Sequence, residues 1–309
     1  MDQYELNEQL FKAAREGNLT KIKRLVKNGA DINATFSIDA AYGGEEDDDK
    51  YGMTPLMFFA SEGFLTVKKL ETFLNLGADI NKTVLGFATA LIFAAGNDSF
   101  NTKLLDAFIS HGADINAKDS EKMTALMWTA ANGRLTKVLL ERFLQHGIDI
   151  NTQDSSDISA LMYEIRNNGS LPDLDILKTF IQNGADINAQ DEDGWTPLMI
   201  LAEYGGLTME LLEFFIEHGV DLKLKNYQEK EIFEYSDCAE TLIRLLVQKM
   251  DTDPQWAVGF VKKHLKKYLE TWVKDGVDGA DILVSRLAHR LRQEEFMSEG
   301  AGMPDLDLF

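Results

Sequence analysis

The fold is decided by residues 124–151, which read TALMWTAANGRLTKVLLERFLQHGIDIN. Thr124 suits the N-cap of a helix, because its hydroxyl can accept a hydrogen bond from the backbone of the first turn. Gly147 follows a second apolar segment and suits the left-handed conformation that ends many helices. Asp149 and Asn151 are typical turn residues. The stretch therefore predicts two short helices followed by a turn.

The same pattern recurs along the chain. A phrase of the type Gly-Ala-Asp-Ile-Asn starts at positions 29, 77, 112, 147 and 184, and a degenerate copy occupies 219–223. A phrase of the type Thr-Pro-Leu-Met starts at positions 54, 89, 124, 159 and 196, so its spacings are 35, 35, 35 and 37 residues. Two phrases that alternate in fixed order predict a repeat protein in which each unit packs on its neighbours.

These phrases resemble those of the ankyrin repeat family over about residues 5–250. The resemblance implies an all-α solenoid, in which each unit is a β-turn finger and two antiparallel helices. The family usually has a His after the repeated Leu, and that His links neighbouring units. Here the position holds apolar residues that we expect to supply packing instead, namely Met57, Ile92, Met127, Met162 and Met199.

The repeat pattern predicts an array over residues 1–250. Its parts are an N-terminal cap at 1–33, an acidic insertion at 34–50, repeats at about 51–223 and a weak last repeat at 224–250. The insertion ends in five successive carboxylates, Glu45 to Asp49, which are typical of a solvated loop. A weak cation site and a docking patch for a basic partner are the alternative interpretations.

The resemblance does not extend past residue 250. Asp251-Thr252-Asp253-Pro254 breaks the chain, and apolar residues at helical spacing then predict a helical C-terminal cap over 251–297. Lysines fill the other face of its first helix, which leaves a basic surface for a partner or a membrane as an alternative. Residues 298–309 are predicted to be a flexible tail.

Composition limits the classes of function. The 309 residues include 31 Lys and Arg against 51 Asp and Glu, so the net charge of −20 disfavours nucleic-acid binding and a membrane surface. The single cysteine, Cys238, suits a reducing compartment. The chain begins with neither a basic segment nor an apolar run, so we expect a cytoplasmic protein.

The residue types needed for catalysis do not form a recognisable motif. Three of the five histidines, His111, His146 and His218, directly precede a helix-ending Gly, where a cationic side chain is favourable. No paired Cys, His-x-x-x-His or phosphate-binding Gly motif accompanies them. We therefore expect no enzymatic activity, no cofactor and no metal.

Large apolar residues recur near the first helix of each predicted unit, where ankyrin arrays have their concave face. We interpret them as a partner-binding strip with an acidic rim, although packing between units is an equal alternative. The rim would include Glu192, Asp193 and Glu203. The strip comprises Phe58, Phe93, Met123, Trp128, Tyr163, Trp195, Ile200 and Tyr204.

The sequence thus predicts non-catalytic protein–protein recognition, with a partner that offers a basic or helical docking segment. Two alternatives remain open. The C-terminal residues Leu306, Asp307, Leu308 and Phe309 resemble a bacterial sliding-clamp-binding motif, which implies a clamp-docked regulator of DNA replication or repair. The acidic charge also fits a nucleic-acid mimic that inhibits a DNA-handling protein.

Overall fold

A computed structural model describes residues 2–37, 52–83, 88–167, 173–204 and 206–298. The chain forms two compact units. Unit 1 comprises Met1–Asn167 with Asp175–Ala185, and unit 2 comprises Asn168–Leu174 with Asp186–Phe309. The all-α fold expected from the repeats is confirmed in both units.

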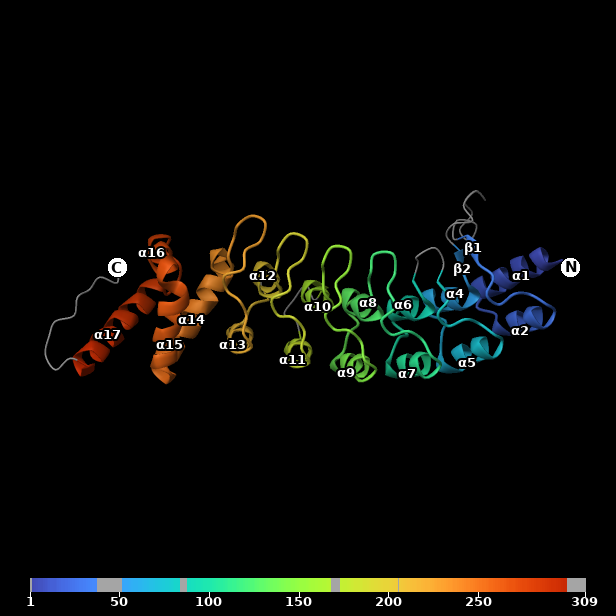
Figure 1. Ribbon diagram of the computed structural model, residues 1–309, viewed down its shortest axis with the longest axis horizontal. Coiled ribbons are helices and arrows are strands. Elements are labelled where there is room, and N and C mark those ends of the chain that lie inside the picture. Colours follow the sequence, from blue (N-terminus) through green and yellow to red (C-terminus); the bar gives the residue numbers. More distant parts are fainter. Residues whose placement is uncertain (1, 38–51, 84–87, 168–172, 205, 299–309) are drawn as a thin grey trace. The chain divides into compact units, whose positions relative to one another are not determined.

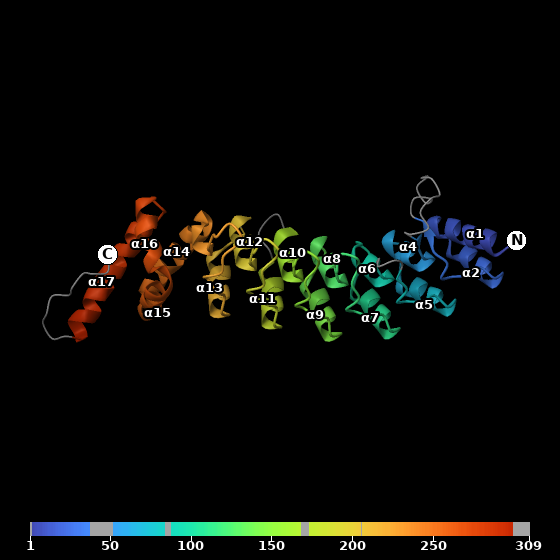
Figure 2. The same ribbon diagram turned by 45° about the horizontal axis from the view of Figure 1, so that its top comes forward.

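Unit 1 is built from helix pairs, whose first members form one row and whose second members form another (Figures 1 and 2). A Thr or Asn at the N-cap begins most of these helices. The pairs are α1 (Gln3–Arg15) with α2 (Leu19–Lys27), α4 (Pro55–Ser61) with α5 (Val67–Asn75), α6 (Ala90–Ala95) with α7 (Thr102–Ser110), α8 (Ala125–Ala131) with α9 (Lys137–Gln145), and α10 (Ala160–Asn167) with α11 (Leu174–Gln182).

The core of unit 1 repeats with the sequence. The repeated Leu of each first helix is buried, as Leu126 illustrates at 1% exposure. The second helices α5, α7, α9 and α11 each add a fully buried phenylalanine, at positions 73, 108, 143 and 180, and α2 buries Ile22 and Leu25 instead. The apolar residues at the usual His position, such as Met127, are also buried, so they supply packing as expected. Burial of this apolar surface is the main force that holds the stack together.

Asparagine side chains connect each turn to the next. Asn81 donates from Nδ2 to the carbonyl of Gly112 (2.8 Å) and accepts at Oδ1 from the backbone N–H of Asp114 (2.9 Å). Asn33 and Asn116 make the same two bonds to the turns that follow them. In unit 2, Asn188 does so with the turn at 219–221. We call this series the asparagine ladder.

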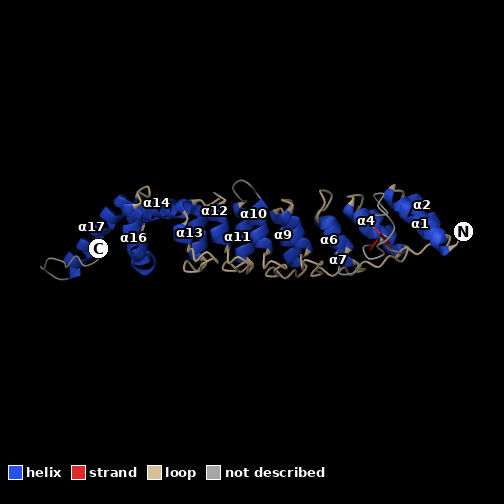
Figure 3. Cartoon of the chain, turned by 90° about the horizontal axis from the view of Figure 1, so that it is seen from above, coloured by secondary structure: helices blue, strands red, loops and turns tan. Residues whose placement is uncertain are grey.

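The finger at the start of the array contains the two short strands, β1 (Phe36–Ser37) and β2 (Gly52–Met53), which pair antiparallel (Figure 3). Residues 38–50 of the predicted acidic insertion lie outside the described residues. The interpretation of its carboxylates therefore stays a prediction.

Unit 2 contains one further helix pair, α12 (Pro197–Glu203) and α13 (Met209–Glu217). Asp253 caps the helix that follows the predicted break, accepting a hydrogen bond from the backbone of Trp256 (3.1 Å). The remaining elements are η1 (Ile232–Glu234), α14 (Ser236–Thr252), α15 (Pro254–Phe260), the π-helix η2 (Val261–Leu265), α16 (Lys266–Lys274) and α17 (Ala280–Ser298).

Candidate functional site

Three of the eight strip residues belong to the core. Phe58, Met123 and Ile200 are only 7%, 8% and 1% exposed. The Phe58 ring packs edge-on against Phe11, with centroids 5.7 Å apart, and thus joins α4 to the N-terminal α1. The expectation that these three residues contact a partner is therefore wrong, because packing within the array already covers them.

The other strip residues reach the surface. In unit 1, Phe93, Trp128 and Tyr163 occupy the same position of α6, α8 and α10, and each is half-buried. In unit 2, Trp195 is half-buried at the base of a finger. Tyr204, at the C-cap of α12, is 64% exposed. We call the first three the aromatic row.

An aspartate at the base of the finger fixes the polar end of two row residues. The indole Nε1 of Trp128 donates to Oδ2 of Asp119 (2.7 Å), and the Tyr163 hydroxyl donates to Oδ2 of Asp154 (2.5 Å). The other oxygen of Asp119 accepts from the backbone N–H of Glu121 and Met123. One carboxylate thus folds the finger and holds the aromatic side chain beside it.

The sequence analysis did not predict these two aspartate–aromatic hydrogen bonds, Asp119 with Trp128 and Asp154 with Tyr163, which we call the clamp. Its signal in the sequence is an Asp nine residues before the aromatic residue, as at 119 and 128 and again at 154 and 163. The same spacing recurs in unit 2, where Nδ2 of Asn226 donates to the Tyr235 hydroxyl (3.0 Å). A polar residue at the finger base and an aromatic residue on the next helix are therefore a structural pair.

The contact with Asp154 also affects the ionisation of Tyr163. Burial raises the pKa of Tyr163, and the hydrogen bond to Asp154 and the charge of that carboxylate raise it further. The hydroxyl stays neutral and donating at physiological pH. The row is therefore made of neutral rings, and the carboxylates of Asp119 and Asp154 are engaged in hydrogen bonds to two of them.

Unit 2 carries an acidic patch with exposed tyrosines. Glu192, Asp193 and Glu203 are exposed, as predicted for a rim. Tyr227, which sequence reasoning did not single out, is 77% exposed, and its backbone N–H donates to the carbonyl of Asp193 (2.9 Å). Burial raises the pKa of Tyr235, and the negative charges of Glu203 and Glu234 raise it further.

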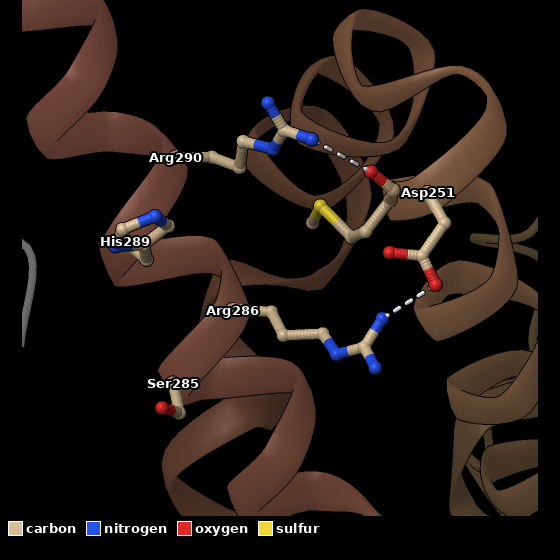
Figure 4. Close-up of a pocket in the computed structure, with 6 residues that line it drawn as sticks. Asp251, Ser285, Arg286, His289 and Arg290 are labelled. Carbon is tan, nitrogen blue, oxygen red and sulfur yellow. Dashed lines mark hydrogen bonds and ion pairs between the residues drawn. The ribbon is translucent and has the colours of Figure 1, made fainter.

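A polar pocket of about 430 Å³ lies between α14 and α17 (Figure 4). Arg286 donates to Asp251 (2.8 Å) and to the carbonyl of Val247 (3.3 Å), and Arg290 donates to the carbonyl of Met250 (3.4 Å). The last carbonyls of a helix lack partners within the helix, and Arg290 supplies one to Met250 in the last turn of α14. Both arginines of the pocket are therefore engaged with the C-terminal part of α14.

The histidines that precede glycine have structural partners in two cases. His146 contacts Asp106 through Nε2 (2.7 Å), and Nδ1 of His218 contacts the carbonyl of Phe214 (2.8 Å). In the part of the chain that the structure describes, no group of three His, Cys, Asp or Glu side chains could hold a metal ion. No helix among those residues is long and apolar enough to cross a membrane. The tail residues 306–309 lie outside the described part.

Comparisons with known proteins agree with this architecture. The family model for ankyrin repeats (3 copies) matches residues 10–119, 91–191 and 161–255. The solved ankyrin repeat domain of Bcl-3, a member of the IkappaB protein family, is similar in fold, with 23% identity and a TM-score of 0.53. The match covers 73% of this chain and 92% of that domain. A search of the curated proteins finds no match. With regular helix pairs, finger turns and a family match over most of its length, the chain belongs to the ankyrin repeat family.

Proposed function

We propose that this protein is a non-catalytic recognition module that binds another protein through the aromatic row of unit 1. The observation that carries the proposal is the recurrence of half-exposed rings, Phe93, Trp128 and Tyr163, at one position of three successive repeats. Aromatic side chains that are partly exposed and held in place are the typical anchors of protein interfaces.

Preorganisation favours this role. Asp119 and Asp154 hold the polar ends of Trp128 and Tyr163, so little rotamer entropy remains to be lost when a partner packs on the rings. The net charge of −20 steers basic segments toward the molecule. We therefore propose a basic or helical docking segment as the partner's contribution.

The experiment selects peptides from a displayed library on the intact protein and measures their affinity for matched variants. The double substitution Trp128→Ala and Tyr163→Ala should weaken binding by about 2 kcal/mol or more, which is the size of an anchor truncation. Val138→Ala is the control, because Val138 is 61% exposed on α9, in the row of second helices. Selected peptides should be rich in Lys and Arg.

Circular dichroism and thermal melting show whether the double variant is folded. Peptides that bind the folded double variant as tightly as the wild type would refute the row as the binding surface. An additional Trp128→Phe variant keeps a ring but removes the bond to Asp119, so it separates the packing surface from the clamp.

We also propose a cytoplasmic location. The support is the single cysteine, Cys238, which is buried, since proteins of oxidising compartments more often carry paired cysteines.

A further inference from the structure

Unit 2 contains a second pocket, of about 370 Å³, that concentrates positive charge in an acidic protein. The segment 254–274 holds five lysines and one glutamate, although the whole chain has a net charge of −20. Leu222 and Phe233 provide an apolar wall. The ionisable side chains of the lining are Lys223, Glu231, Lys262, Lys263, His264 and Lys266.

His264, which lies in the π-helix η2, has a ring nitrogen without a hydrogen-bond partner among the described residues. His264 packs against Phe260 (centroids 4.9 Å apart), four residues earlier, as His218 packs against Phe214 (4.0 Å). In α13, Nδ1 of His218 contacts the carbonyl four residues back (2.8 Å). In a π-helix such as η2, each backbone hydrogen bond spans five residues instead of the four of an α-helix. Nδ1 of His264 is buried there and has no partner among the described residues.

A buried ring nitrogen without a partner costs free energy, and the rest of the His264 residue lines the pocket. Lysine residues on two separate segments line the same pocket, namely Lys223 on one and Lys262, Lys263 and Lys266 on the other. Ammonium groups bind phosphate oxygens as point charges, and the volume is in the range of small-molecule sites. A ligand with a phosphate and an apolar part would match both kinds of lining.

We propose that this pocket binds a small phosphorylated molecule, with its phosphate oxygens held by Lys223, Lys263 and Lys266 and with His264 beside it in the lining. This site is independent of the aromatic row, because all of its residues belong to unit 2.

The charges around the pocket act on a bound phosphate in opposite directions, so substitutions of the lysines and of Glu231 should change the affinity in opposite directions. Glu231 lies in the same lining as a buried carboxylate that accepts a hydrogen bond from the Tyr268 hydroxyl. Its negative charge opposes a bound phosphate, while the lysines favour it. Burial lowers the pKa of His264, and Lys263 and Lys223 lower it further against the opposing charge of Asp221. A bound anion would raise that pKa.

The experiment titrates the full chain with pyrophosphate at pH 7, by calorimetry and by NMR of the histidine rings. The substitutions Lys223→Gln and Lys263→Gln together should weaken binding by about tenfold or more. Glu231→Gln should strengthen it. The control pair Lys68→Gln and Lys118→Gln removes the same charge from exposed positions of unit 1 and should leave the affinity unchanged.

Three results would overturn the proposal. The first is an equal loss of affinity in the pocket variants and the control pair, which would mean non-specific charge attraction. The second is a His264 pKa that does not rise when pyrophosphate saturates the protein. The third is tighter binding of citrate than of pyrophosphate, which would assign the pocket to carboxylates rather than phosphates.

Discussion

At the scale of single residues, methionine sulfur takes part in beginning the first helices. The backbone N–H groups of Thr54, Thr124 and Ser159 each point to the sulfur of the Met three residues later, at 3.4, 3.4 and 3.5 Å. The Thr or Ser oxygen in turn accepts from the backbone N–H of that Met. This is a capping box in which a thioether replaces the usual Glu or Gln. At Thr89 the corresponding residue is Ile92, which has no acceptor, and Thr89 Oγ1 is buried with no partner among the described residues.

This difference predicts opposite effects of one substitution. Thr124→Val removes a helix cap and should lower the free energy of unfolding by about 0.5–2 kcal/mol. Thr89→Val removes a buried hydroxyl that caps nothing, so it should be neutral or stabilising. Urea denaturation of the two single variants measures the contrast. Equal losses at both positions would show that the hydroxyl of Thr89 does form a cap in solution.

At the scale of secondary-structure elements, an ionic cluster joins the second helices of two adjacent repeats. Asp106 on α7 contacts Arg142 (2.7 Å) and His146 (2.7 Å) on α9. Burial raises the pKa of Asp106, but the hydrogen bonds from His146 and Arg142 and their charges outweigh it. The pKa is therefore lower than the ordinary 3.8. A carboxyl group whose pKa is lowered by folding stabilises the folded state above its unfolded pKa.

The pH dependence follows from that sign. The contribution of Asp106 is complete above the unfolded pKa of 3.8 and is lost as the pH falls through the lower folded value. Asp106→Asn should therefore reduce the unfolding free energy at pH 7 and change it much less at pH 2–3. Urea titrations at several pH values test this. Asp98→Asn is the control, because Asp98 pairs with Arg134 but is 91% exposed. A loss from Asp106→Asn that does not vary with pH would contradict the expectation.

The sequence predicted elements better than surfaces, for physical reasons. Capping residues and helix-ending glycines set helix boundaries through local backbone contacts. The helix pairs could therefore be predicted from the repeated phrases that begin at Thr124 and at Gly147. Whether an apolar side chain is covered depends on the neighbouring unit, so sequence could not separate buried Ile200 from half-exposed Trp128. The clamp of Trp128 by Asp119 joins residues nine apart across a finger, which no helical or strand period describes.

At the scale of the whole molecule, the chain forms two compact units. Leu126, which is 1% exposed, lies in the centre of unit 1, and its truncation to Ala should cost about 2–5 kcal/mol. Because each repeat is stabilised by its neighbours, hydrogen exchange should accelerate in α6, α8 and α10. Exchange in α14 and α17 should stay unchanged. Acceleration of the same size throughout both units would mean that the chain unfolds as one cooperative body.

The asparagine ladder ends at Lys223, which occupies the position that Asn holds in the earlier repeats. Each Asn side chain both donates a hydrogen bond to the next turn and accepts one from it. The Lys223 ammonium group has donors only, so it cannot accept a hydrogen bond from a backbone N–H. Duplication of a repeat upstream of this position extends the series with its connections intact. A repeat added after Lys223 would find no acceptor, unless Lys223 were first replaced by Asn. The same lysine lines the phosphate pocket proposed above. The residue that ends the asparagine ladder is therefore also a residue that would contact the proposed ligand.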